Sequence, residues 1–200
     1  MKKRLPVIIA FILTIAAAFF FSHIDKEHRI YNNNVNSLSY IDAGLLEDGE
    51  VYRQVLVCKE DVLNGFRIKN SIAGAYEDVT VRMEIYDAES EELITAVEEP
   101  GSAFKRQKIH YYKTEVLSGM KGRKLLVSLS ESGSSMGNGI LMYYVPQDGE
   151  YKAMLGDREL DGLMPVATVT DRFDTETFII FLLSLWFIWG FMWFLYKLFQ

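Results

Sequence analysis

VTVRMEIYD, residues 79–87, alternates between two sets of side chains, and one set is apolar as far as Ile85. The apolar side chains occupy every second position, namely Val79, Val81, Met83 and Ile85. Successive side chains of a β-strand point to opposite faces of the sheet, so a period of two indicates a strand with one buried face. The stretch therefore predicts β structure, with Arg82, Glu84 and Tyr86 on the solvent side.

Runs of similar texture lie on both sides of residues 79–87, separated by Gly, Asn, Asp or Pro. They occupy residues 51–58, 66–70, 92–97, 108–116, 124–131, 140–146, 150–155 and 165–170. With residues 79–87, these eight runs amount to about nine strands with no convincing helix among them. The sequence predicts a mainly β fold, an antiparallel β-sandwich or jelly roll over residues 51–172.

Two apolar segments flank this region, residues 5–22 and 177–198. As a helix, the second segment spans roughly 33 Å, which is enough to cross a hydrocarbon core. The first segment follows residues 1–4, which carry three basic side chains, a layout shared by cleaved signal peptides and uncleaved signal anchors. Ala16 and Ala18 offer a cleavage pattern, whereas the three phenylalanines that follow favour an anchor. We expect two transmembrane helices.

Flanking charges predict the orientation, because Lys and Arg are retained in the cytoplasm. Residues 1–4 form a basic cytoplasmic stub, and Lys197 follows the second apolar segment, whereas Asp174 and Glu176 precede it. We expect a two-pass protein of the plasma membrane with both termini cytoplasmic and an extracellular central domain. That domain keeps 17 of the 21 basic residues against 27 acidic ones. Nucleic acid and anionic lipid are poor partners for it.

Residues 23–50 are polar, and their asparagines favour turns over regular structure. We expect a polar stalk, or a strap across the domain. Since both ends of the domain return to the same membrane face, its first and last strands should lie near each other.

The order of the strands carries a resemblance. Gln54 lies in the opening strand, and LNGFRI (63–68), VTVRMEIYDAESEELI (79–94), GRKLLVSL (122–129) and NGILMYY (138–144) follow it. In this order, residues 51–144 resemble the jelly-roll (carbohydrate-binding-module-like) exterior domains of Gram-positive membrane proteins associated with cell-surface polysaccharide assembly. Leu125 departs from the pattern, since such domains often carry an aromatic residue there. The resemblance implies contact with sugar and identifies no binding residue.

Aromatic rings that stack on sugars, flanked by charged or amide groups, are the usual means of glycan recognition. The candidates on three of the predicted strands are Tyr86 with Arg82 and Glu84, Tyr112 with His110, and Arg67 with Lys69. The alternative interpretation is that the tyrosines pack at strand edges and the charges form an ordinary solvated face.

Catalysis finds little support in the sequence. The only imidazoles are His23, His28 and His110, and no nucleophile, zinc-protease or phosphate-loop motif is present. An exterior hydrolase would need paired carboxylates, such as Glu84 with Glu115. The acidic residues within 87–92 lack the spacing of a calcium loop, so we expect a solvated hairpin turn there. We predict no enzyme, no metal and no cofactor.

The apolar segments themselves offer surfaces for packing. One helix face of the second segment carries Trp186, Trp189 and Trp193, and the first segment carries a small-residue stripe of Ala10, Thr14 and Ala18. We expect these surfaces to pack against each other, within the chain or between copies, or against a membrane-embedded partner protein. The alternative is that the tryptophans simply meet lipid.

Two functions of different classes follow. The first is a non-enzymatic accessory protein whose exterior sandwich binds or guides cell-surface glycan for a polysaccharide-assembly complex in the membrane. The second is a structural or interaction subunit of a membrane protein complex, whose sandwich binds protein and not sugar.

Overall fold

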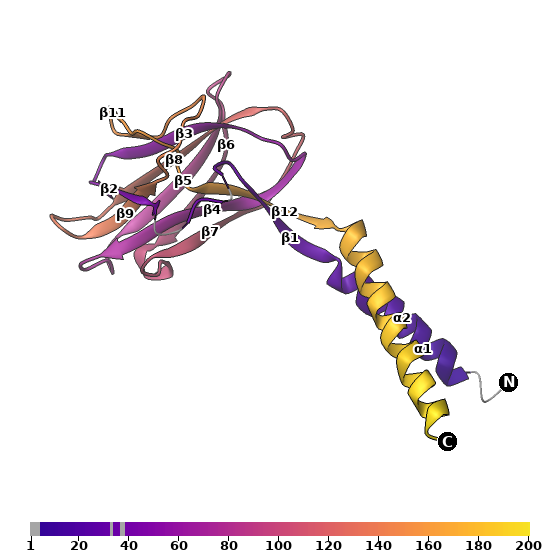
Figure 1. The fold of residues 1–200 in the computed structure, drawn as a ribbon. Helices are drawn as coiled ribbons and strands as arrows, with labels where there is room; N and C mark the ends of the chain where they lie inside the picture. Colours follow the sequence, from indigo (N-terminus) through magenta and orange to yellow (C-terminus); the bar gives the residue numbers. More distant parts are fainter. Residues whose placement is uncertain (1–4, 33, 37–38) are drawn as a thin grey trace. The chain divides into compact units, whose positions relative to one another are not determined.

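The computed structural model describes residues 5–32, 34–36 and 39–200 of the chain. The expected stub of residues 1–4 lies outside the described residues. The chain forms two compact units: one contains the residues up to Lys26 together with 171–200, and the other contains residues 27–170. Figure 1 shows that the first unit is built around two helices and the second around β-strands.

The helical unit contains α1 (Leu5–Phe21) and α2 (Thr175–Leu198). The chain passes between the units within β1 (His23–Arg29) and again within β12 (Val166–Phe173). The other strands are β2 (Ile41–Leu45), β3 (Val51–Val57), β4 (Val62–Ala73), β5 (Thr80–Asp87), β6 (Leu93–Pro100), β7 (Lys108–Ser118), β8 (Lys124–Ser132), β9 (Gly139–Tyr144), β10 (Met154–Leu155) and β11 (Arg158–Glu159).

The strands form two six-stranded antiparallel sheets. Sheet A has the order β1-β12-β4-β9-β2, with β7 also paired to β4, and sheet B has the order β11-β10-β3-β8-β5-β6. Buried side chains of both sheets belong to one core, which includes Phe66 and Ile68 from sheet A and Met83 and Leu129 from sheet B. The mainly β, antiparallel, sandwich-like fold is therefore confirmed.

Alternation of apolar and polar residues identified the strands that have one buried face. Val81 and Met83 of β5 are fully buried, whereas Arg82, which lies between them in the strand, is exposed. The predicted runs from 51–58 to 140–146 correspond to β3 through β9. Residues 150–155 form only the two-residue β10, which pairs with β3.

Residues 23–50 are not an irregular stalk, since they contribute β1 and β2 to sheet A. The sequence HIDKEHR of β1 has no apolar alternation, and β2 contains a bulge between Asp42 and Gly44. Backbone pairing with β12 and β9 places these two strands, and of their residues Ala43 alone is buried in the core. The first strand of the chain lies beside the last one, as expected, but this first strand is β1 and not the predicted one at 51–57. The strand at 51–57 belongs to sheet B.

The centre of sheet A is β4. Its residues Val62–Asn70 pair with β7 on one side, while β12 and β9 share the other side, at Gly65–Ile68 and Asn70–Ala73. Because β4 is paired on both sides, its outward side chains lie between those of β7 and those of β9 or β12.

The buried side chain of Gln54 on β3 accepts the N–H of Met164, two residues before β12 begins.

In the helical unit, α1 and α2 pack against each other. The rings of Phe21 and Phe181 stack with their centroids 4.6 Å apart. Below the helices, Asp174 donates its N–H to the Ser22 carbonyl (2.8 Å), and its carboxylate pairs with Lys26 (2.9 Å). This ammonium, with the Thr177 hydroxyl, lowers the pKa of Asp174 to about 2. The segment that follows α1 and the segment that precedes α2 are thus tied together.

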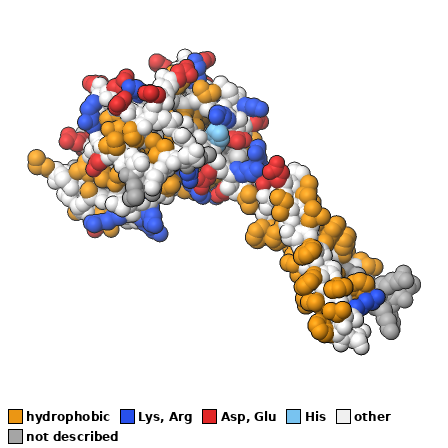
Figure 2. All heavy atoms as spheres, in the orientation of Figure 1, with side chains coloured by type: hydrophobic (Ala, Val, Ile, Leu, Met, Phe, Trp, Pro, Cys, Tyr) orange, Lys and Arg blue, Asp and Glu red, His pale blue; other side chains and the backbone are white. Residues whose placement is uncertain are grey.

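Among the described residues, α2 is the one helix that is long and apolar enough to cross a membrane. Its 24 residues span roughly 36 Å, whereas the 17 residues of α1 span roughly 26 Å. Figure 2 shows that the helices are covered with apolar side chains, while the strands present interspersed acidic and basic ones.

Candidate ligand-binding surface

The outer face of sheet A carries two tyrosine rings, each beside a basic side chain. Arg67 on β4 lies over Tyr111 on β7, with its Cζ 5.2 Å from the ring centroid. Lys69 on β4 has its Nζ 5.6 Å from the ring centroid of Tyr143 on β9. Since residues 67 and 69 are two apart in one strand, both side chains point to the same face. These four residues are termed the tyrosine row.

Further contacts fix the tyrosine row. The Glu27 carboxylate on β1 pairs with Arg67, and both side chains are about 30 % exposed. The Tyr111 hydroxyl donates to the Asn64 carbonyl (3.1 Å), which holds the ring along the sheet. Cation–π contacts at such partly exposed sites contribute about 0.5–1 kcal/mol each. The row is an ordered, partly solvated platform.

At one end of this platform, residues 105–107 turn back toward the sheet. Gln107 has a left-handed backbone (φ 53°), which a non-glycine residue rarely adopts. Its N–H donates to the Ser71 hydroxyl (3.0 Å), and its carbonyl accepts the Lys69 ammonium. Burial, and then the neighbouring Lys108, lower the pKa of Lys69. Several cations therefore crowd together at this end.

The outer face of sheet B holds three of the predicted ligand-binding residues. Arg82 donates to Glu84 (2.8 Å) and to Glu98 (2.7 Å), and the Tyr86 hydroxyl donates to Glu84 (2.9 Å). The hydrogen bond to Glu84 raises the pKa of Tyr86. The three side chains lie together but already satisfy one another, so they form a closed surface network.

Tyr112 does not lie on the surface, and its predicted role as a surface ligand residue is wrong. Its ring is fully buried in the core, and its hydroxyl accepts from the Asn70 amide (3.3 Å). His110 points to the same side of β7, where it stacks on Phe104 with centroids 4.1 Å apart, and its Nε2 lies 3.4 Å from a Glu99 oxygen. Burial lowers the pKa of His110. These side chains close the sandwich between β6 and β7.

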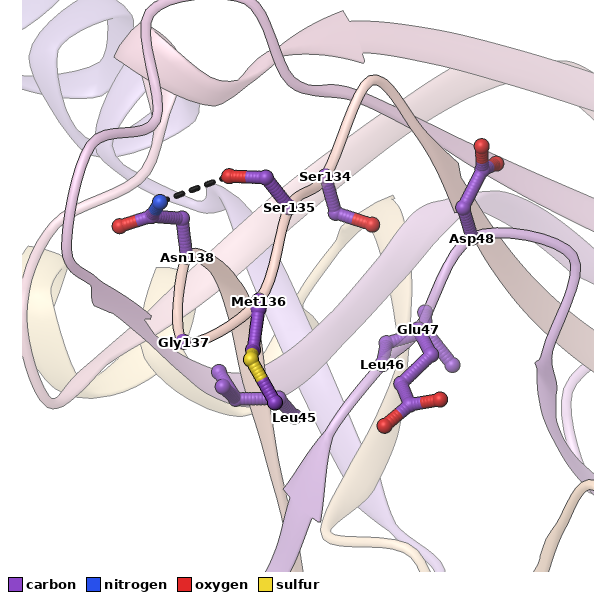
Figure 3. A pocket seen from close by; sticks show the side chains of 9 residues that line it. All are labelled: Leu45, Leu46, Glu47, Asp48, Ser134, Ser135, Met136, Gly137 and Asn138. Atoms are coloured by element: carbon purple, nitrogen blue, oxygen red, sulfur yellow. Dashed lines mark hydrogen bonds between the residues drawn. The ribbon is translucent and has the colours of Figure 1, made fainter.

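A hollow of about 410 Å³ lies between the loop after β8 and the residues after β2. Figure 3 shows Ser135 and Asn138, joined by a 2.7 Å hydrogen bond, on one side and Glu47 and Asp48 on the other. The side chain of Met136 at the loop tip is fully exposed. The hollow is wide and open, and its lining carries no imidazole or thiol.

A buried carboxyl group lies at the base of this loop. Glu131 on β8 is 4 % exposed and accepts the Ile140 N–H (2.9 Å). Its other oxygen lies against Gly139, where a Cβ would come within 2.4 Å of it. Burial raises the pKa of Glu131 to about 7. This group fixes the β8–β9 hairpin and is a source of pH-dependent stability.

The acidic segment 87–92 forms the turn between β5 and β6. Asp87 accepts the N–H groups of Glu89 (2.9 Å) and Ser90 (3.0 Å), and Arg123 donates to it (2.6 Å). These bonds lower the pKa of Asp87 to about 2. No group of three or more His, Cys, Asp or Glu within the described part of the chain could hold a metal ion. Of the considered hydrolase pair, Glu84 lies on sheet B and Glu115 on β7 of sheet A.

The predicted packing residues of the helices lie as follows. Ala18 is fully buried, and Ala10 and Thr14 are half-buried on the same side of α1. Trp186 stacks on Phe11 with centroids 5.4 Å apart. Trp189 and Trp193 remain 44 % and 62 % exposed, and Lys197 lies over the Trp193 ring.

Two members of the tyrosine row, Tyr111 and Tyr143, were missed by sequence reasoning. Both occur in Tyr-Tyr pairs, where alternation alone leaves open which ring faces out. The register decides, because Tyr111 lies opposite Arg67 and Tyr112 lies opposite Phe66.

Comparison with protein-family models and with curated proteins found no match to this chain.

Proposed function

We propose that this protein is a membrane-anchored, non-enzymatic binding protein whose β-sandwich binds or guides cell-surface glycan for a polysaccharide-assembly complex. The observation that supports the proposal is the tyrosine row on the outer face of sheet A. A flat sheet face offers ring surfaces to the apolar sides of sugars and charged donors to their hydroxyl groups. Tyr111 with Arg67, and Tyr143 with Lys69, supply both kinds of group at two successive outward positions of β4.

Anchoring is part of the same proposal. In it, α1 and α2 both enter the plasma membrane, and the sandwich is extracellular. The apolar surfaces of both helices and the tie between Lys26 and Asp174 just before α2 support a two-pass arrangement. A Lys–Asp pair outside the apolar segments keeps both charges at the water side of an interface. Protease treatment of intact cells should then cut the strands and spare residues 177–198.

Glycan binding is tested with the full chain in nanodiscs of zwitterionic lipid on an array of bacterial surface glycans. The informative variants are Tyr111→Leu and Tyr143→Leu, with Tyr151→Leu as a matched control outside sheet A. We expect each row variant to weaken binding about tenfold, since stacking of one ring contributes about 0.5–1.5 kcal/mol beyond its buried area. Equal loss in the control, or silence of the array with the native chain, contradicts the proposal.

The protein-binding alternative makes the opposite prediction for the array. It expects no bound glycan and a co-purifying membrane protein that is lost on changing the same sheet A face. The array therefore separates the two functions before any partner is identified.

A further inference from the structure

We propose that the hollow beside the start of β7 binds an anionic group, a carboxylate or a phosphate, and that the glycan ligand is therefore acidic. The inference rests on the proposed function and names the class of its ligand. The hollow has a volume of about 290 Å³, and its lining residues are Ala103, Lys105, Lys108, Ile109, His110 and Tyr111.

The lining of this hollow is basic. It contains the side chains of Lys105 and Lys108 and no carboxylate. Within the described part of the chain, neither ammonium group forms an ion pair, whereas Arg82, Arg123 and Lys152 each contact a carboxylate. In a chain that holds 27 acidic residues, two cations without carboxylate partners can attract an anionic ligand.

One carboxylate contacts a residue that lines the hollow. Glu99 lies 3.4 Å from His110 Nε2 and comes from β6 of the other sheet. His110 in turn stacks on Phe104, which is 3 % exposed. The carboxylate therefore meets the lining at the imidazole, and within the described part of the chain it forms no ion pair with Lys105 or Lys108.

The segment that carries the lysines is held in place. A short 3-10 helix, Gly101–Ala103, follows β6 directly, and the buried ring of Phe104 anchors the chain after it. Gln107 is fixed from both sides by Ser71 and Lys69. Lys105 and Lys108 therefore extend from an ordered turn, so little conformational entropy of the backbone is lost when a ligand binds.

The hollow and the tyrosine row share one residue. Tyr111 lines the hollow and also carries Arg67 on its ring. A sugar that stacks near Tyr111 can thus place an acidic substituent between Lys105 and Lys108. Charge-assisted hydrogen bonds to such a group are about twice as strong as neutral ones.

The test uses the full chain in zwitterionic nanodiscs and three probes: an oligogalacturonate hexamer, its methyl ester, and a glycerol-phosphate hexamer. We expect at least one anionic probe to bind about tenfold more tightly than the ester at low salt, with the preference shrinking as salt is added. The probe that binds better identifies the carboxylate or the phosphate as the preferred group. The double variant K105Q/K108Q should lose the preference about fivefold or more, while the control K59Q/K121Q, with the same change of charge, should keep it.

Three outcomes overturn the inference. If the ester binds as tightly as both anionic probes while Tyr111→Leu weakens all of them, the glycan-binding function holds and the anion subsite is wrong. If K59Q/K121Q loses as much affinity as K105Q/K108Q, net charge and not the hollow selects the anion. If none of the probes binds and the glycan array is also silent, the proposed function itself fails, and the inference fails with it.

Discussion

The outer faces of sheet A and sheet B both present Arg and Tyr side chains, but they neutralise the positive charge differently. On sheet B, Arg82 lies between two carboxylates, Glu84 and Glu98. On sheet A, Lys69 lies against a tyrosine ring and a backbone carbonyl. Arg67 pairs with one carboxylate, that of Glu27, and lies over the Tyr111 ring. A cation that faces rings keeps more capacity for an external acceptor than one enclosed by carboxylates. The comparison favours sheet A as the binding face.

The largest expected effect comes from comparing the buried face of β7 with its outer face. Tyr112→Ala should lower the free energy of unfolding by about 3–5 kcal/mol, because it removes a fully buried ring from the core. Tyr111→Ala, one residue earlier on the outer face, should cost much less stability and affect glycan binding. Denaturant unfolding of the full chain in detergent checks both variants. Equal destabilisation would mean that the outer ring is structural.

A smaller effect concerns the interior of sheet B. The pKa of Glu131 is raised to about 7, above its unfolded value of 4.5. Its ionisation therefore costs stability, which is full at pH values below 4.5 and falls as the pH rises toward 7. Glu131→Gln should remove about 3 kcal/mol of this pH dependence. Unfolding curves between pH 4 and pH 8 give the measurement, and an unchanged slope in the variant would contradict the account.

Glycan affinity then compares the two arginines directly. Arg67→Gln should weaken binding about tenfold, because it removes the charged donor above Tyr111. Arg82→Gln should leave binding unchanged, since that guanidinium is already enclosed by Glu84 and Glu98. The reverse order of the two effects would assign the binding face to sheet B.

The smallest expected effect lies in the β5–β6 turn. The pKa of Asp87 is lowered to about 2 by backbone N–H groups and Arg123, so its stabilisation is present above pH 3.8 and is lost as the pH falls through 2. Asp87→Asn should flatten the acid limb of the stability curve below pH 4 and leave glycan binding intact. Circular dichroism during acid titration checks this, and an identical acid limb would refute the assignment.

The fold could be predicted where burial of one face imposes a period of two, as in β5. It could not be predicted for β1 and β2, whose places depend on hydrogen bonds to β12 and β9, strands far away in the sequence. The same limit applies to the site. Arg67 was named from its strand, but its partners Tyr111 and Tyr143 come from strands on either side of β4. Only strand order brings these residues together.

Hydroxyl-radical footprinting of the full chain, with and without the tightest-binding glycan, tests the central claim most directly. The account predicts that the glycan slows oxidation of Tyr111 and Tyr143 while Tyr86 on sheet B reacts at an unchanged rate. Protection of Tyr86 with no change at Tyr111 and Tyr143 would contradict it.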